Sequence, residues 1–431
     1  MLSFNATRIT DWSEDYLNFM SAHRNKKEAV NRWFPILEGF SNSFVQSIIH
    51  EQKLGELTCL DPFSGGGTTS LVAQDLGIKC HSFEVSPFMS QVCRAKLGKS
   101  YKSVEFIEII DRIETMLSKC QTHNYKIGLK TISKKNNLKK WLYHKTALDS
   151  LLCIRRAIDE VTEVFPQYKD ILYVTLGSIL LQFSNVNRDG KALKYKENWD
   201  KKIYRRKLIY STFIEKCKTS VLDDILNVER KSYDNLVNNI ELLKTGDCRE
   251  LIDQIENSSV DLVITSPPYL NSRDYTDSHM IELWILGHVN SYEDVRFLRR
   301  QTMRSHVQVK WGQYVLPNSM LLEDRLNKVL LHKERFWNSS IPSMIAGYFC
   351  DLEDLLLSLK SKCKSGALLY INVANSSYFG VVIETDRIIE EIANNLNYKV
   401  LEIRLARKIK TSSQQSSEVK WLRETVIVLQ A

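Results

Sequence analysis

The chain has 431 residues, of which 43% are hydrophobic and 26% charged, and its formal net charge is +8. This length and composition are typical of a globular protein with one large domain carrying insertions, or with two domains. No apolar run approaches the ~20 residues that a membrane helix needs, and the N-terminus lacks the apolar core of a signal peptide. We therefore expect a cytoplasmic protein without membrane contacts. Its modest positive charge permits a polyanionic partner.

The nine cysteines are scattered, none lies in a Cys-x-x-Cys pair, and no His-Glu-x-x-His motif occurs. Because structural zinc sites usually need such spacings, we expect no metal site. Most of the cysteines should be small buried apolar residues.

Residues 1–55 are predicted to be mainly helical, because apolar side chains recur at helical spacing from Trp33 to Ile49. Core packing is the favoured interpretation of this stripe. The alternative is a helix whose end touches a ligand.

The first strand is predicted at Leu57–Leu60, followed by Asp-Pro-Phe-Ser-Gly-Gly-Gly-Thr-Thr at 61–69 and a helix over Ser70–Leu76. Strand, glycine loop and helix together form the opening unit of a nucleotide-binding α/β sheet. The glycines let the backbone approach a ligand, and the helix N-terminus offers free N–H groups to an anion. No Lys-Ser/Thr pair follows the glycines, so the loop is not a P-loop, and a carboxylate is the better candidate for the anion.

A second strand, Lys79–Glu84, ends in an acid, and Ser86-Pro87 starts another helix that runs to about Gly98. An acid at the tip of the second strand can accept hydrogen bonds from ribose hydroxyls. The plain alternative for Glu84 is a solvated glutamate at a strand end.

Residues 100–235 interrupt the strand pattern and are predicted to form a mainly helical insertion. They contain a basic run at 134–140 and a second one at 188–207. The second run has nine lysines and arginines but only three acids. Basic residues interleaved with aromatic and amide side chains suit a surface that follows nucleic-acid phosphates, and we select Arg188, Lys191 and Lys194 as candidates. The alternative is a solvated charged face.

The sheet is predicted to resume with a strand over Asn239–Leu243. Asp247 follows it and is placed to accept a hydrogen bond from a purine amino group. A helix at Cys248–Ile255 then leads into a buried strand at Val260–Ile264.

The stretch Thr265-Ser-Pro-Pro-Tyr269 follows this buried strand. The prolines stop the strand and stiffen the loop, because neither ring nitrogen can donate to a sheet. Ser266 offers a hydroxyl, the backbone offers carbonyls, and Tyr269 offers an aromatic face, which together suit a flat heterocycle with an amino group. An ordinary Pro-Pro turn is the alternative, since a four-residue motif is weak alone.

The remaining chain is predicted to continue with a polar loop containing Arg273 and a core helix at 281–287. A second, irregular and basic insertion follows at 288–345. A helix at 352–359, a strand at 367–373, a helix at 386–395 and strands at 399–405 and 424–429 complete the sheet.

The segments 61–69 and 265–269 resemble the two motifs of the S-adenosylmethionine-dependent amino-group DNA methyltransferases. The first is similar to Asp-Pro-Phe-x-Gly-x-Gly-Thr-Thr and the second to Asp/Asn/Ser-Pro-Pro-Tyr. The resemblance covers roughly residues 56–98, 239–287 and 365–430, and the serine at 266 is most like the N4-cytosine branch. The cofactor motif comes before the catalytic motif here, unlike the familiar N4-cytosine enzymes. No Pro-Cys dipeptide occurs, so the C5-cytosine branch is excluded.

The resemblance implies a Rossmann-like sheet, mostly parallel with an antiparallel last strand. Residues 1–99 and 236–431 would form the catalytic domain, 100–235 the candidate target-recognition insertion, and 288–345 a smaller insertion within the catalytic domain. It assigns cofactor binding to Asp61, Phe63, Gly65, Gly67, Thr68, Glu84 and Asp247, and catalysis to Ser266, Pro267, Pro268 and Tyr269. Arg273 joins the three basic residues of the insertion as a nucleic-acid candidate.

The expected activity is methyl transfer from S-adenosylmethionine to the amino group of a flipped base in double-stranded DNA, at cytosine N4, within a restriction–modification or defence system. A cognate restriction endonuclease would be a partner. Adenine N6 is the first alternative, because adenine also presents an amino group. An RNA base methyltransferase and a non-catalytic DNA-binding subunit are alternatives of other classes.

Overall fold

The structure is a computed structural model, and it describes residues 6–17, 19–20, 24–36, 39–52, 57–120, 123–135, 137–189, 192–229, 237–270, 272, 274–308, 315–411 and 418–431. An eight-stranded sheet forms its centre, with strand order β1-β11-β12-β8-β7-β2-β3-β6. The strands are β1 (Ile9–Asp11), β2 (Thr58–Asp61), β3 (Lys79–Glu84), β6 (Leu243–Thr245), β7 (Val260–Thr265), β8 (Cys363–Ala374), β11 (Lys399–Lys410) and β12 (Trp421–Gln430).

The last strand, β12, is antiparallel to both of its neighbours, β8 and β11, while every other neighbouring pair of this sheet is parallel. The chain passes from β2 outward to β3 and β6, then returns to β7 on the opposite side of β2. The order therefore reverses between β2 and β7, which is where open α/β sheets bind ligands. This arrangement confirms the predicted Rossmann-like methyltransferase sheet.

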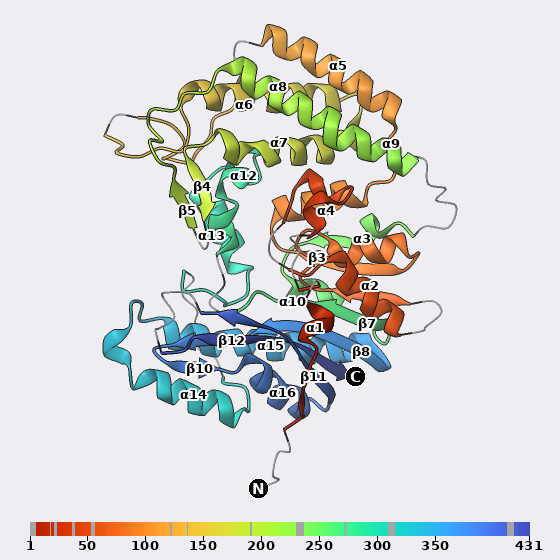
Figure 1. Cartoon of the computed structure of the whole chain (residues 1–431), viewed down its shortest axis with the longest axis vertical. Helices are drawn as coiled ribbons and strands as arrows, with labels where there is room; N and C mark the ends of the chain where they lie inside the picture. The colour runs from red at the N-terminus through yellow and green to blue at the C-terminus, as the bar shows by residue number, and fades with distance from the viewer. Residues whose placement is uncertain are drawn as a thin grey trace.

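Alternation along the strands explains the layers on both faces of the sheet. Leu60, Val263 and Leu369 pack with the helices α14 (Met320–Leu330), α15 (Ile341–Lys362) and α16 (Thr385–Asn395). Their neighbours Cys59, Leu262 and Tyr370 face α2 (Asn42–Glu51) and α3 (Thr68–Asp75) on the other side. In Figure 1, the blue and cyan helices lie below the sheet, and the red and orange helices lie on its other side.

The prediction of a mainly helical N-terminal segment is wrong in part. Ile9–Asp11 forms β1 at the sheet edge, and α2 begins only at Asn42, where Ser41 caps it by accepting from the backbone N–H of Phe44 at 3.4 Å. The apolar stripe is divided because Gly39 has a φ of +105°, which breaks helical geometry.

The strand predicted at Asn239–Leu243 is also displaced. Residues Asn239–Leu242 form a 3-10 turn, and β6 begins at Leu243. The buried Asn239 side chain explains this, because its Oδ1 accepts from Cys80 N–H at 3.0 Å and its Nδ2 donates to the Ile78 carbonyl at 2.9 Å. The Asn239 side chain thus forms hydrogen bonds with the start of β3, at the position where the backbone of an added strand would otherwise form them.

The span 100–235 carries five helices in its described part, in line with the predicted helical content: α5 (Ser103–Lys119), α6 (Lys145–Thr162), α7 (Lys169–Phe183), α8 (Arg206–Lys216) and α9 (Asp223–Glu229). A hairpin, β4 (Val186–Asp189) and β5 (Ala192–Tyr195), joins them. These helices lie above the sheet in Figure 1. They share one core with α4 (Pro87–Leu97), where a side chain on Gly177 would meet Phe88 at 3.0 Å. The domain boundaries remain predictions.

The span 288–345, predicted to be irregular, contains α13 (Tyr292–Arg300) and α14, and α15 already begins at Ile341. The helix predicted at 352–359 is therefore the second half of a longer one. The sequence did not indicate the first half of this helix because it contains Gly347, and glycine is a poor helix former. The structure uses this glycine for close packing, since a Cβ there would lie 2.6 Å from Arg304 Cδ.

The cysteines of the chain are free, and most are buried. Among the residues that the structure describes, no group of acids, histidines and cysteines could hold a metal ion. No described helix combines the length and apolarity needed to cross a bilayer.

Candidate active site

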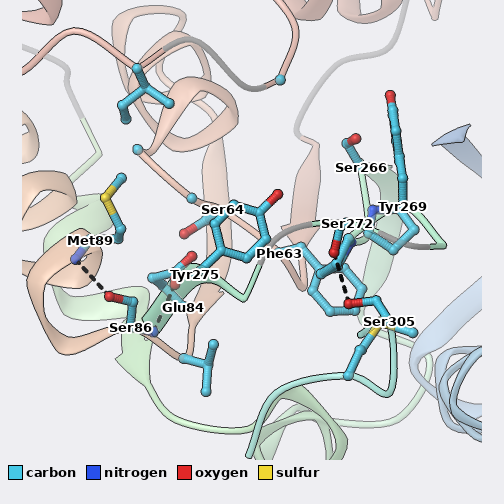
Figure 2. A pocket seen from close by; sticks show the side chains of 18 of the residues that line it. Phe63, Ser64, Glu84, Ser86, Met89, Ser266, Tyr269, Ser272, Tyr275 and Ser305 are labelled. Carbon is cyan, nitrogen blue, oxygen red and sulfur yellow. Dashed lines mark hydrogen bonds between the residues drawn. The ribbon is translucent and has the colours of Figure 1, made fainter. Parts of the chain in front are cut away.

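A cavity of about 560 Å³ opens where the parallel strands end, and both sequence motifs line it. Because β2, β3, β6, β7 and β8 run parallel, their carboxyl ends meet at one edge, and the segments after them converge there. Figure 2 shows Glu84 and Ser86 toward one side of this cavity, Ser266 and Tyr269 toward the other, and Phe63 between them. A volume of this size fits a small-molecule cofactor together with part of a second ligand.

Asp61 connects the two motifs. One oxygen, Oδ1, accepts from the backbone N–H of Phe63 at 3.1 Å and from Thr265 Oγ1 at 2.8 Å, and Oδ2 accepts from Thr69 Oγ1 at 2.6 Å. Burial raises the pKa of Asp61 to about 6, although the hydrogen bonds from Thr69 and Thr265 lower it. Asp61 therefore orients the glycine loop, the start of α3 and the end of β7 relative to one another.

The glycine loop has the backbone that its sequence requires. Gly65 and Gly67 have φ values of +51° and +80°, which favour glycine. A Cβ on Gly65 would meet nothing within 4 Å, whereas one on Gly67 would lie 2.4 Å from Cys93 Sγ. Gly67 immediately precedes α3, whose first residue is Thr68. The buried Ser64 hydroxyl on the cavity wall has no partner among the described residues, so the loop offers an unused polar group to a ligand.

Glu84 ends β3 on the cavity wall. Its Oε1 accepts from the Ser86 N–H at 2.7 Å. Burial raises the pKa of Glu84 to about 7, while backbone hydrogen bonds from Ser86 and Gly65 lower it. A carboxylate in this position can accept hydrogen bonds from ligand hydroxyls when it is ionised.

Asp247 also borders the cavity, but both of its oxygens are engaged. It caps α10 (Cys248–Leu251), accepting from Arg249 N–H at 3.0 Å, and it pairs with the Arg249 guanidinium at 2.6 Å. Arg249 in turn bridges to the buried Asp351 at 2.6 Å. Lone pairs remain on the Asp247 carboxylate, since each oxygen can accept more than one hydrogen bond.

The Ser-Pro-Pro-Tyr loop is held by a network that the sequence did not predict. The Tyr269 hydroxyl donates to Glu424 Oε1 at 2.6 Å and accepts from Asn372 Nδ2 at 2.8 Å, and Arg407 pairs with the other Glu424 oxygen. Burial raises the pKa of Tyr269 well above its usual range, and Glu424 raises it further. The hydroxyl therefore stays protonated, and its hydrogen bonds orient the ring beside Ser266.

The partners of Tyr269 come from β8, β11 and β12, far along the chain. One signal was available in the sequence, because the acid Glu424 lies just before the run of strand-forming residues Thr425–Leu429. Asn372 is a polar residue within the largely apolar second half of β8.

The four nucleic-acid candidates have different surroundings. The Arg188 guanidinium pairs with the buried Glu282 at 2.7 Å and donates to the Ser278 carbonyl at 3.0 Å. It thereby ties the β4–β5 hairpin to the region of α11 (Tyr275–Ser278) and α12 (Met280–Ile285). Lys194 is exposed and pairs with Asp189 at 2.6 Å. Lys191 and Arg273 lie outside the described residues.

No protein-family model matches the chain, but comparison with known proteins finds methyltransferases that are similar to it. Type II methyltransferase M.BsoBI of Geobacillus stearothermophilus is 28% identical over 92% of this chain and 84% of that protein. Type II methyltransferase M.AvaI of Nostoc sp. (strain PCC 7120 / SAG 25.82 / UTEX 2576) is 26% identical over 95% and 88%. M.MvaI of Kocuria varians, also a Type II methyltransferase, is 21% identical over 90% and 86%.

A solved structure of rRNA methyltransferase aviRa from Streptomyces viridochromogenes aligns over 95% of this chain and 96% of its own, at 10% identity and a TM-score of 0.29. A TM-score this low carries no argument. The three relatives, in contrast, cover at least 90% of this chain, which includes most of the helical insertion. They confirm the resemblance that the two motifs indicated. The chain is therefore a relative of the Type II methyltransferases, and the donor of its methyl group is S-adenosylmethionine.

Proposed function

We propose that the chain is a site-specific DNA methyltransferase that methylates the exocyclic N4 amino group of a flipped cytosine. The observation that carries this proposal is the position of the glycine loop and the Ser-Pro-Pro-Tyr loop on one cavity, joined through Asp61. The Type II methyltransferases among its relatives support a role in restriction–modification. A restriction endonuclease with the same recognition sequence is the expected partner.

The cofactor residues are those on the glycine-loop side of the cavity. Backbone groups from Gly65 to Thr68 would hold the methionine part, Glu84 the ribose hydroxyls, and Asp247 the adenine amino group. The Phe63 ring would line the same pocket. Bound S-adenosylmethionine supplies an electrophilic methyl group on a sulfonium. The unpartnered Ser64 hydroxyl and the open space over Gly65 support this fit.

The residues for the base lie on the other side of the same cavity. An aromatic amine is a weak nucleophile, because its lone pair is delocalised into the ring. Ser266 Oγ and the carbonyls between Ser266 and Pro268 would accept hydrogen bonds from the amino protons and align the nitrogen with the methyl group. The Tyr269 ring would stack on the flipped base. With the cofactor bound, the methyl group would pass from sulfur to the amino nitrogen, and the amino proton that the base loses would pass to water.

Serine at position 266 supports cytosine, since the resemblance associates Asp or Asn at this position with adenine. Nucleoside mass spectrometry tests the base directly. Purified protein is incubated with S-adenosylmethionine and unmethylated DNA of many sequence contexts, with the Tyr269→Ala variant as control. We expect N4-methylcytosine from the wild type and its loss from the variant. N6-methyladenine would overturn the base assignment, and no methylated nucleoside would overturn the proposal for DNA.

A further inference from the structure

Lys96 is a buried cation with no counter-ion among the residues that the structure describes. It lies on α4 behind the glycine loop, its side chain is 5% exposed, and it borders the cavity. Its Nζ donates to the Gly66 carbonyl at 3.0 Å and to Asn31 Oδ1 at 3.1 Å. An ammonium has three protons, and within the described chain neither a third acceptor nor a carboxylate pairs with Lys96. Because a buried charge is costly without a partner, the site is suited to an anionic ligand.

Asn31 places a second unused donor beside this ammonium. The residue is 4% exposed and borders the cavity, and its Nδ2 has no hydrogen-bond partner among the described residues. Because its Oδ1 accepts from Lys96, the amide N–H groups are held next to the ammonium. Two adjacent donors of this kind match the two oxygens of a carboxylate.

A strained turn holds Asn31 in this position. The Asn31 N–H bonds back to the Ala29 carbonyl at 2.7 Å, which closes a γ-turn around Val30 with φ +67° and ψ −45°. A β-branched residue at positive φ is strained, and such strain persists where the surrounding structure enforces it, often at ligand sites.

Asp224 of α9 holds the turn at Val30 in this strained conformation. Its buried carboxylate accepts from the Val30 N–H at 2.8 Å and from Trp33 Nε1 at 2.9 Å, and it pairs with Arg32 at 2.7 Å. The helical insertion therefore holds the turn that presents Asn31 to the cavity.

We propose that Lys96 and Asn31 bind the α-carboxylate of the methionine part of S-adenosylmethionine. Lys96 contacts the backbone of the glycine loop, and Glu84, the candidate for the ribose, lines the same cavity. The enclosed position favours a small carboxylate over a nucleic-acid phosphate. This inference rests on the proposed function only through the identity of the cofactor.

The test compares S-adenosylmethionine with decarboxylated S-adenosylmethionine, which lacks only the carboxylate. Dissociation constants are measured by isothermal titration calorimetry for the full chain and for Lys96→Met. We expect the wild type to prefer S-adenosylmethionine by about 10- to 100-fold, the range for a hydrogen-bonded charge pair. Lys96→Met should lose most of this preference and keep its affinity for the decarboxylated compound.

Lys362→Met is the matched control, because Lys362 is also buried and also donates to an asparagine, Asn257, at 2.8 Å. It lies next to Ser259, before β7 begins, and so at the opposite end of that strand from the cavity. This variant should keep the wild-type preference. Equal affinities of the wild type for the two compounds, or a full preference in Lys96→Met, would overturn the proposal.

A second variant covers the case in which Lys96→Met fails to fold. Asn31→Asp puts a carboxylate beside the expected ligand carboxylate, so it should favour the decarboxylated compound. An unchanged preference in Asn31→Asp would contradict the proposal. Base methylation is assayed separately. Carboxylate discrimination without DNA methylation would refute the proposed function alone, and DNA methylation without discrimination would refute this inference alone.

Discussion

Lowering the pH below 7.5 should weaken the binding of S-adenosylmethionine through Glu84. Burial raises the pKa of Glu84 to about 7, and hydrogen bonds from ribose hydroxyls favour its ionised form. Binding therefore competes with protonation, and the affinity falls as the pH falls through this pKa. For a single group of pKa about 7, the dissociation constant should rise roughly fivefold between pH 7.5 and pH 6.3.

The pH range of this assay is chosen so that Glu84 dominates. Burial raises the pKa of Asp61 to about 6, so its protonation begins at the lower end of this range and adds a smaller change than that of Glu84. Lys96, whose pKa burial lowers to about 8, titrates at higher pH. Calorimetric titrations at several pH values between 6.3 and 7.5 should give the fivefold change for the wild type.

Glu84→Gln cannot ionise, so its weaker binding should change with pH much less than that of the wild type in this range. Glu390→Gln is the matched control, because Glu390 is a buried carboxylate of α16 that pairs with Arg387 at 2.6 Å outside the cavity. It should keep the wild-type slope. A flat wild-type profile, or an equal slope in Glu84→Gln, would refute the assignment of Glu84 to the ribose.

Three further predictions concern the loop, the turn and the insertion. Tyr269→Phe keeps the ring but removes the hydroxyl that donates to a buried carboxylate. It should lower the free energy of unfolding in urea by about 1–2 kcal/mol and still methylate faster than Tyr269→Ala, and equal rates would contradict stacking. Asp224→Ala leaves the buried Trp33 indole N–H and the partly buried Val30 N–H without their acceptor. The variant should lose about 2–4 kcal/mol of unfolding free energy and bind the cofactor more weakly. Asp223→Ala, at an exposed neighbouring position, should change neither quantity. Equal effects of the two substitutions would refute the role of the turn. Arg188→Ala leaves a buried glutamate uncompensated and should cost about 3 kcal/mol of stability. Lys194→Ala should change the free energy of unfolding by less than about 0.5 kcal/mol. It should reduce the slope of log binding constant against log salt concentration for DNA by about one. An unchanged slope would exclude a phosphate contact.

The sequence alone determined the strands and loops that carry local signals. Asp61–Thr69 and Thr265–Tyr269 could be identified because glycines with positive φ and paired prolines restrict the backbone within a few residues. Glu84 could be placed because it follows a run of strand-forming residues. The resemblance that the two motifs carry also implied a mostly parallel sheet with an antiparallel last strand.

The tertiary structure decided what surrounds these loops. The γ-turn at Val30 depends on Asp224, and β6 begins late because Asn239 bonds to β3. These interactions join residues more than 150 positions apart, so no local pattern contains them.

The same reason applies to single side chains whose chemistry is set by their partners. Arg188 was selected for its charge, and in the structure that charge is paired with Glu282. Lys96 gave no signal in the sequence, and it becomes notable because the fold buries its ammonium beside Asn31 and the glycine loop. Residue type sets what a side chain can donate or accept, but burial and long-range pairing decide which of those groups remain available for a ligand.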